Sequence, residues 1–196
     1  AAMMEPMAVA VHAMRRFYIE KDSSVCVIGL GTIGLLLTMF LKAEGIQNVY
    51  VEGNKDMQKH FAQKLGVDDE HYNVDNVVAD YVFECVGKNE TINRAIELAA
   101  PAGNIVLVGN PYSEMNIPKD TYWKILRKQL KLSGTWNSSY AGESGDDWHY
   151  VLNMLADGRI DPEQFITHEY PLDAIQKGME IMRDKSEDYV KVMCIS

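Results

Sequence analysis

Residues 24–34 read Ser24-Val25-Cys26-Val27-Ile28-Gly29-Leu30-Gly31-Thr32-Ile33-Gly34. This is an apolar, strand-like run that ends in a GxGxxG motif and continues into a helix-like apolar stretch, the context in which the motif binds dinucleotides. Gly29 permits the tight turn, Gly31 lets the backbone approach a pyrophosphate, and Gly34 lets helix and strand pack closely. The first helical turn, with Thr32 and Ile33, presents N–H groups and a positive dipole end to the phosphates. A tight turn without a ligand is the alternative.

The alternation of strand-like and helix-like segments continues along the chain. Strands are expected at residues 24–29, 48–52, 71–74, 81–85, 104–108 and 130–136, and helices at 6–19, 32–43, 55–65, 90–99 and 122–129. Such alternation over short links predicts right-handed βαβ units and a parallel sheet with helices on both faces. The predicted fold is therefore α/β, a doubly wound Rossmann sheet of six parallel strands. The strand at 71–74 has the weakest support, because its surroundings are acidic and irregular.

The pattern changes after Asn137. A polar loop is expected at residues 138–146, a helix at 147–157, and two strands, 166–170 and 189–195, around a helix at 172–185. This tail does not continue the strict alternation. We therefore expect it to belong to a different structural unit.

Composition and charge exclude several classes of function. The chain has 196 residues, of which 47% are hydrophobic, and a formal net charge of −9 with no basic cluster. General nucleic-acid binding and attraction to anionic membranes are therefore disfavoured. No apolar run approaches the ~20 residues that span a bilayer. The three cysteines, Cys26, Cys85 and Cys194, fit neither a metal motif nor a disulfide framework, so reduced, buried thiols in a cytoplasmic protein are expected.

The choice of cofactor depends on the end of the second strand, where an acid bonds the ribose hydroxyls of NAD. Glu52 follows Gly34 by 18 residues, close to the ~20 expected of that acid. Alternatively, Gly53 occupies the acid's place and leaves room for the 2′-phosphate of NADP beside Asn54 and Lys55. The residues alone leave both alternatives open.

An ordered series of segments resembles the zinc-dependent medium-chain alcohol and polyol dehydrogenases. The segments are Glu5-Pro6 with His12-Ala13 and Arg15-Arg16, residues 27–34, Phe83-Glu84-Cys85-Val86-Gly87, Val106-Leu107-Val108-Gly109-Asn110, residues 125–128 through Gly134-Thr135-Trp136-Asn137, Ile166-Thr167-His168 with Pro171-Leu172, and Lys191-Val192-Met193. They cover nearly the whole chain. Within the family the likeness is greatest to the sorbitol, threonine and galactitol-1-phosphate dehydrogenases.

The resemblance implies two domains, a GroES-like catalytic barrel that carries zinc and a Rossmann domain that carries the nicotinamide cofactor. Residues 1–20 would be a linking helix from the catalytic domain, residues 21–144 the Rossmann domain, and residues 145–196 the returning segment of the catalytic domain. The family's Cys and His-Glu zinc ligands lie upstream of Glu5, the one residue here that matches a zinc-site position. Glu5 could equally be an acid that favours a helix N-terminus. No catalytic residue is expected in this chain, which alone should be inactive.

When the sequence is aligned on the family, the position of the ribose-binding acid falls at Gly53. The run Gly53-Asn54-Lys55 resembles the Gly-Ser-Arg of members that prefer NADP, so NADP is favoured over NAD. Without an acid a 2′-phosphate is not repelled, and Lys55 would supply a counter-charge, although it could also be a plain helix-face lysine.

The resemblance also assigns roles to two strand ends. Backbone groups of Val86 and Gly87, and of Val108, Gly109 and Asn110, would bracket the nicotinamide ring and its carboxamide. The alternative, that these glycines simply end strands, is compatible with this role.

Two hypotheses of function follow. The first is the cofactor-binding portion of a zinc-dependent NAD(P)-dependent dehydrogenase that acts on an alditol or alditol phosphate such as galactitol 1-phosphate. The second is a stand-alone, non-catalytic dinucleotide-binding module that senses redox state. In either case Leu130–Trp136 would be an edge strand, and the resemblance implies a homodimer that pairs this strand with its own copy.

Overall fold

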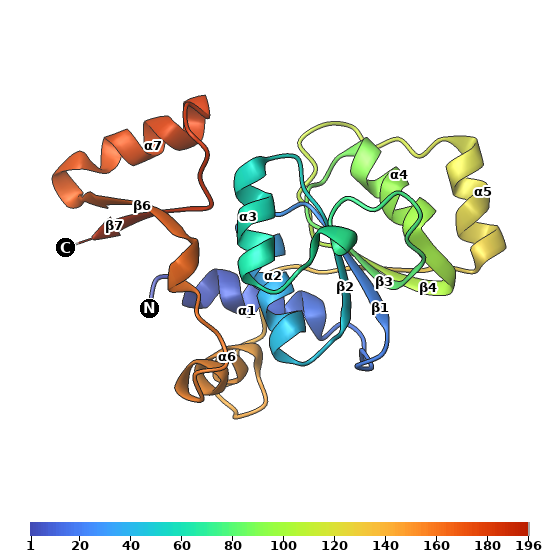
Figure 1. The fold of residues 1–196 in the computed structure, drawn as a ribbon, viewed down its shortest axis with the longest axis horizontal. Coiled ribbons are helices and arrows are strands. Elements are labelled where there is room, and N and C mark those ends of the chain that lie inside the picture. The colour runs from blue at the N-terminus through green and yellow to red at the C-terminus, as the bar shows by residue number, and fades with distance from the viewer. Residues whose placement is uncertain (196) are drawn as a thin grey trace. The chain divides into compact units, whose positions relative to one another are not determined.

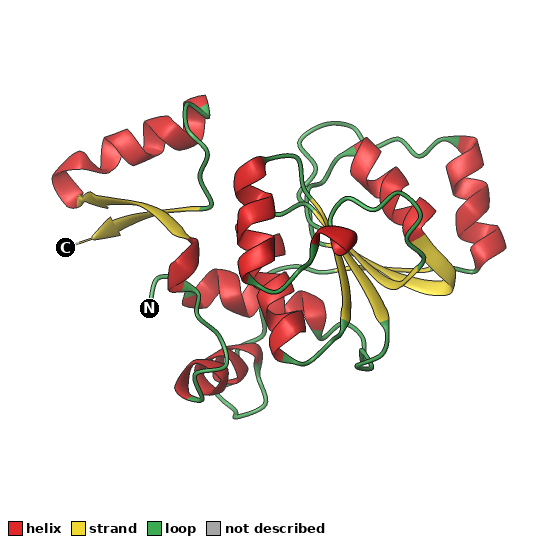
Figure 2. Cartoon of the chain, viewed as in Figure 1, coloured by secondary structure: helices red, strands yellow, loops and turns green. Residues whose placement is uncertain are grey.

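The computed structural model describes residues 1–195, which form two compact units, one from Ala1 to Ile160 and one from Asp161 onward. Figures 1 and 2 show the elements of both. The first unit contains helices α1 (Met4–Met14), α2 (Thr32–Ala43), α3 (Asp56–Lys64), α4 (Asn89–Leu98), α5 (Lys119–Lys128) and α6 (Asp147–Ala156), and the 3-10 turn η1 (Asp69–His71). Its strands are β1 (Ser24–Ile28), β2 (Asn48–Glu52), β3 (Ala79–Glu84), β4 (Ala99–Leu107) and β5 (Lys131–Gly134).

The sheet of the first unit is parallel throughout, in the order β2-β1-β3-β4-β5. Helices α2 and α3 cover one face, and α4 and α5 cover the other (Figure 1). This confirms the α/β, Rossmann-type parallel fold. Strand β5 lies at the edge of the sheet, as the sequence predicts for Leu130–Trp136.

The sheet has five strands among the described residues, so the prediction of six was wrong. The expected strand at 71–74 is reduced to a single parallel bridge between Val51 and Tyr72. The acidic run before it forms η1, and Asn73 has a φ of 52°, a left-handed conformation that ends extended backbone. The bridge nonetheless lies beside β2, where a sixth strand would extend the sheet.

Alternation of side chains along the strands builds a core on each face of the sheet. Cys26, Ile28, Val82 and Ile105 pack against α4. Val27 points to the opposite face of the sheet, towards α2. Its Cγ1 lies 3.6 Å from the position that a Cβ on Gly34 of α2 would take. Strands buried on both faces explain why these segments are apolar at nearly every position.

Several element bounds differ from the sequence prediction. Helix α1 ends at Met14 rather than at residue 19, and beyond its end the carbonyl of Tyr18 accepts a hydrogen bond from the Tyr81 hydroxyl. Strand β4 begins at Ala99, five residues earlier than expected. Helix α6 packs against α1 within the first unit. The division of the chain at residues 20 and 144 stays a prediction about a longer protein.

The second unit contains η2 (Glu163–Phe165), β6 (Ile166–Pro171), η3 (Leu172–Ala174), α7 (Ile175–Asp184) and β7 (Lys191–Ile195). Strands β6 and β7 pair in parallel, and α7 packs on them. The approach is close at Gly178, where a Cβ would lie 2.8 Å from Cγ1 of Val192.

The described thiols are all free, and burial separates them. Cys26 is buried and Cys85 is partly buried, whereas Cys194 is exposed, so the expectation of a buried thiol was wrong there. Burial raises the pKa of both Cys26 and Cys85 far above the usual thiol range. No helix in residues 1–195 is long and apolar enough to cross a membrane.

Candidate functional site

The glycine loop joins β1 to α2, and the space around each of its three glycines is different. Gly29 has a φ of +93°, and a Cβ there would lie 2.3 Å from Cγ2 of Val86. A Cβ on Gly34 would lie 1.9 Å from the carbonyl oxygen of Gly29. A Cβ on Gly31, by contrast, would meet nothing within 4 Å. The fold therefore requires glycine at 29 and 34, whereas the open space at Gly31 is available to a ligand that needs the backbone bare.

Helix α2 begins directly at this open space. Gly31 is its N-cap residue, and Thr32 and Ile33 form the start of its first turn. The helix is buried from Gly34 to Leu41. Its packing on the sheet therefore fixes the direction of its axis and the place of the positive end of its dipole. An anionic group in front of Gly31 would meet that end.

The buried side chain of Glu84, at the end of β3, organises the two neighbouring strand ends. Its Oε1 accepts hydrogen bonds from the backbone N–H groups of Val86 (2.8 Å) and Gly87 (2.9 Å). Its carbonyl oxygen accepts from the N–H groups of Val108 (2.8 Å) and Gly109 (2.9 Å). One residue thus joins the two turns to which the family resemblance assigns the nicotinamide.

The two turns also pack backbone against backbone. A Cβ on Gly87 would lie 2.4 Å from the carbonyl oxygen of Asn110, and a Cβ on Gly109 would lie 2.1 Å from the nitrogen of Gly87. Glycine is required at both positions by packing alone, which bears out the idea that these residues end strands. Sequence reasoning missed Glu84, although an acid inside the apolar run of a buried strand indicates such a role.

A cavity of about 220 Å³ opens beside these turns. It is lined by residues from four parts of the chain: Glu5, Val9, Ile33, Val108, Asn110, Thr135, Trp136 and Asn137. Four of them, Glu5, Ile33, Val108 and Asn110, are predicted site residues that the fold brings together. The hydroxyl of Thr135 is buried and has no hydrogen-bond partner among the described residues. A buried, unpaired hydroxyl in a cavity suits a polar ligand, so Thr135 is a further candidate site residue, one that sequence reasoning missed.

At the end of β2 the structure separates the two candidate acid positions. Glu52 shares the sheet face of Tyr50, which packs towards α4. Its Oε1 lies 2.6 Å from Nη2 of Arg94 in α4. Gly53 faces the other way, since a Cβ there would lie 3.3 Å from Cδ1 of Leu30 in the glycine loop. The position that faces the loop is therefore 53.

Asn54 and Lys55 lead from this strand end into α3. The N–H of Asn54 donates to Oε1 of Gln58 at 2.9 Å, and Asn54 is exposed. Lys55 is the N-cap residue of α3 and is half-buried. Both lie at the carboxyl ends of the strands, the edge where ligands bind in open α/β sheets.

Glu5 belongs to the first turn of α1. In the described part of the chain no three His, Cys, Asp or Glu side chains come together as a metal site. A zinc site needs three or four such ligands, so the described residues do not fit zinc, and Glu5 is placed only as part of the cavity wall.

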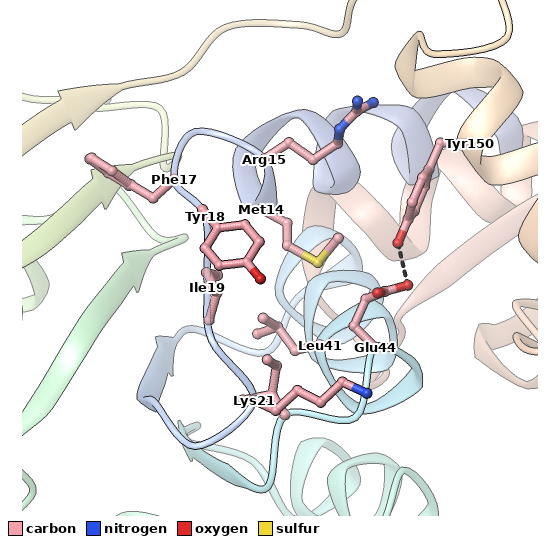
Figure 3. A pocket seen from close by; sticks show the side chains of 10 residues that line it. Met14, Arg15, Phe17, Tyr18, Ile19, Lys21, Leu41, Glu44 and Tyr150 are labelled. Atoms are coloured by element: carbon pink, nitrogen blue, oxygen red, sulfur yellow. Dashed lines mark hydrogen bonds between the residues drawn. The ribbon is translucent and has the colours of Figure 1, made fainter.

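A second cavity, of about 280 Å³, lies at the opposite end of the strands (Figure 3). Lys21 and Ile46 precede β1 and β2, and both line it. Tyr150 closes one side, where its hydroxyl donates to Oε1 of Glu44 at 2.5 Å. Because ligands of such sheets bind at the carboxyl ends of the strands, this cavity is no part of the candidate dinucleotide site.

Comparison with known proteins agrees with this geometry. A family model described as "Glucose dehydrogenase C-terminus" matches residues 2–194. The chain belongs to this family. The resemblance to zinc-type medium-chain alcohol and polyol dehydrogenases is thereby confirmed.

Curated relatives include L-idonate 5-dehydrogenase of Vitis vinifera, 28% identical over 91% of this chain and 50% of that protein. Galactitol 1-phosphate 5-dehydrogenase of Escherichia coli K12 is 26% identical over 85% of this chain and 52% of its own length. The chain thus spans about half the length of these relatives.

Solved structures share the fold. L-idonate 5-dehydrogenase from Escherichia coli matches all of this chain and 56% of its own, with a TM-score of 0.85 and 22% identity. The 2R,3R-butanediol dehydrogenase of Bacillus subtilis also matches the whole chain and 57% of its own, with a TM-score of 0.82 and 25% identity.

Proposed function

We propose that this chain is the cofactor-binding portion of a zinc-dependent, NAD(P)-dependent alcohol or polyol dehydrogenase. The observation that carries the proposal is the open space at Gly31, in front of the buried helix α2 and on the same sheet edge as the cavity beside Val108. A pyrophosphate would take the first and a nicotinamide ring the second. When bound, the nicotinamide supplies the hydride chemistry, and the protein binds and orients it.

Most of the predicted site residues have a place in this proposal. Gly29, Gly31, Thr32, Ile33 and Gly34 would hold the pyrophosphate. Val86, Gly87, Val108, Gly109 and Asn110 would position the nicotinamide through two turns that Glu84 holds together. The hydrogen bonds to the side chain and carbonyl of Glu84 would hold the two turns in place for the ring.

NADP is the proposed cofactor in preference to NAD. Glu52 is paired with Arg94, and the loop-facing position is Gly53, which has no charge to repel a 2′-phosphate. Asn54 and Lys55 follow at the same edge. Among structures of this fold, one from Sinorhizobium meliloti, titled a zinc-binding dehydrogenase, is bound to NADP, and one from Escherichia coli, titled a short chain alcohol dehydrogenase, is complexed with NADH.

The proposed substrate class is an alditol or alditol phosphate, such as galactitol 1-phosphate. A carbon of this substrate would give up the hydride that passes to the nicotinamide. The names of two relatives, galactitol 1-phosphate dehydrogenase and sorbitol dehydrogenase, support this class. In the longer enzyme, residues 21–144 would be the Rossmann domain, and residues 1–20 and 145–196 would belong with the catalytic domain. A homodimer through residues 130–136 is part of the proposal.

Calorimetric titration of the 196-residue chain with NADPH and with NADH tests the proposal. We expect one site per chain and tighter binding of NADPH. Binding of neither would refute the proposed function. Tighter binding of NADH would refute the proposed NADP preference. It would indicate that Glu52, and not Gly53, faces the ribose.

A further inference from the structure

The cavity at the amino ends of the strands has an apolar floor (Figure 3). Met14 of α1, Leu41 of α2 and Ile46 before β2 make this floor and are 7%, 0% and 4% exposed. The segment between α1 and β1 supplies one wall, where the side chain of Tyr18 is 85% exposed. All of the lining residues belong to the first compact unit. The packing of that unit alone therefore forms the cavity.

Two of the charged side chains that line the cavity already have partners. The Glu44 carboxylate accepts from the Tyr150 hydroxyl at 2.5 Å and from Nη2 of Arg159 at 3.1 Å. Burial and the bond to Glu44 raise the pKa of Tyr150, so its hydroxyl keeps its proton and stays a donor. Nη1 of Arg15 lies 3.2 Å from Oδ1 of Asp147. Both charges are thus balanced within the protein.

Lys21 supplies a charge that is not balanced. Its ammonium makes no hydrogen bond or ion pair within the described residues 1–195. The ammonium lies over the turn from α2 to β2, since Nζ is 3.8 Å from the position that a Cβ on Gly45 would take. The residues on either side of Gly45 both line the cavity, whereas Glu20 and Asp22, the sequence neighbours of Lys21, line a different one. A positive group therefore stands at the edge of the apolar floor.

We propose that this cavity binds a small monocarboxylate with an apolar body, which lies over Met14, Leu41 and Ile46 while its carboxylate pairs with Lys21. The volume of about 280 Å³ is close to the lower end, about 300 Å³, of pockets that hold small organic ligands. The inference does not rest on the proposed dinucleotide site. The two sites lie at opposite ends of the strands, so both ligands can be bound together.

The charges around the cavity favour this class of ligand over two others. An organic cation would meet the unpaired ammonium of Lys21 and a Glu44 carboxylate that Tyr150 and Arg159 already occupy. A dianion would bring a second negative charge that no unpaired cation of the lining balances. An apolar body removes the floor side chains from water, which is favourable without any directional bond.

Three ligands with one alkyl chain separate charge from apolar burial. Octanoate carries the carboxylate, octanamide is its neutral counterpart, and octylamine is a cation. In calorimetric titrations we expect one octanoate site per chain and about fivefold weaker binding of octanamide, as for loss of an exposed ion pair. Octylamine should bind more weakly still. Raising the salt to about 0.5 M NaCl should reduce the difference between octanoate and octanamide, because salt screens an exposed charge.

Lys21→Met keeps the apolar stem of the side chain and removes the charge. Octanoate should then bind about fivefold more weakly, with octanamide unchanged. Lys119→Met, which removes an exposed lysine at the start of α5, is the matched control and should bind both ligands like the wild type. Equal binding of octanoate by wild type and Lys21→Met would overturn the role of Lys21.

Ile19→Trp fills the cavity from its wall, where the side chain of Ile19 is half-buried. It should abolish binding of octanoate and octanamide alike, whereas Leu152→Trp, at an exposed position of α6, should bind as the wild type does. Circular dichroism verifies the fold of both variants. Full binding by folded Ile19→Trp would place the ligand elsewhere and overturn the proposal.

Three results with the wild type would also overturn it: no binding of octanoate, tighter binding of octylamine than of octanoate, or displacement of octanoate by NADPH. The titrations with octanoate need no dinucleotide. A chain that binds octanoate but neither NADPH nor NADH would therefore refute the proposed function and leave this inference standing.

Discussion

The carboxylate of Glu52 and the guanidinium of Arg94 connect the end of β2 to the middle of α4. Oε1 of Glu52 accepts from Nε of Arg94 at 2.8 Å, and Nη2 of Arg94 also donates to the carbonyl of Val74 at 3.0 Å. The hydrogen bond to Glu52 raises the pKa of Arg94 above its usual value. Arg94 therefore holds both the strand end and the segment that carries Tyr72.

Replacing Arg94 should destabilise the fold at this point. In Arg94→Met the Glu52 carboxylate, 18% exposed, loses its counter-charge, and the free energy of unfolding should fall by about 2 kcal/mol, less than for a fully buried pair. Arg94→Lys keeps the charge and should recover part of the loss. Urea unfolding measures both variants, and a wild-type midpoint for Arg94→Met would contradict the role of the pair.

Gly31→Val should abolish dinucleotide binding while leaving the protein folded. A Cβ at this position meets nothing within 4 Å in the protein, so the valine side chain would project into the proposed pyrophosphate position. Calorimetry with NADPH checks binding, and the far-ultraviolet circular dichroism checks the fold. Gly34→Ala is the contrasting variant, because its Cβ would collide with Gly29 and should lower stability. Equal affinity of wild type and Gly31→Val would remove Gly31 from the site.

The 196-residue chain alone should not oxidise polyols, even with added Zn²⁺. A catalytic zinc needs three protein ligands and an open position, and residues 1–195 bring no such group together. The assay follows NADPH formation from sorbitol or galactitol 1-phosphate, on samples whose dinucleotide binding has first been verified. Steady NADPH production would refute the expectation.

Strand β5 should pair with its own copy in a symmetric dimer. Thr135 donates its N–H to the carbonyl of Leu107 in β4. By the two-residue alternation of a strand, the N–H of Ser133 faces β4 as well, and that of Leu132 faces the open edge. Leu132→Pro should therefore spare the sheet and disrupt the dimer.

Sedimentation at micromolar concentration distinguishes the outcomes. The wild type and Leu132→Ala, which keeps the N–H, should sediment as dimers, and Leu132→Pro should sediment near the chain mass of 22.1 kDa. A wild-type monomer would exclude the dimer.

Acid should remove the stabilising effect of Asp146, the N-cap residue of α6. Burial alone would raise the pKa of its carboxyl. Hydrogen bonds from the backbone N–H of His149 (2.8 Å), its ring (2.9 Å) and the N–H of Ala141 (3.0 Å) nevertheless hold it well below the usual range. A group whose pKa is lowered in the folded state stabilises fully above its unfolded value, about 3.9, and loses the effect as pH falls towards the folded value.

The melting temperatures of wild type and Asp146→Ala should therefore differ most near pH 6 and converge towards pH 2. Asp157→Ala, at the exposed other end of α6, is the control and should follow the wild type throughout. A difference that stays constant with pH would contradict the assignment.

Local patterns in the sequence were enough to predict the architecture and the glycine loop. The motif from Gly29 to Gly34 and the alternation of strands and helices involve residues close in sequence, so their physics can be read without knowing the fold. The same holds for the edge position of Leu130–Trp136, the last strand of the series. The expected strand at 71–74 failed because a left-handed Asn73, held by its side-chain bonds to Gly53, interrupts it.

Only the tertiary structure decided which residues meet at the site. Counting along the chain could not choose between Glu52 and Gly53, because the choice depends on Arg94, 42 residues away, and on the sheet face that each position occupies. The unpaired Thr135 hydroxyl and the Tyr72 hydroxyl beside Gly53 could not be predicted from the sequence, and for Glu84 the sequence showed only an acid in an apolar run, without its hydrogen-bond partners. The physical reason is common to all of them: hydrogen bonds and charge pairs between distant residues depend on side-chain direction, which packing determines and sequence spacing does not.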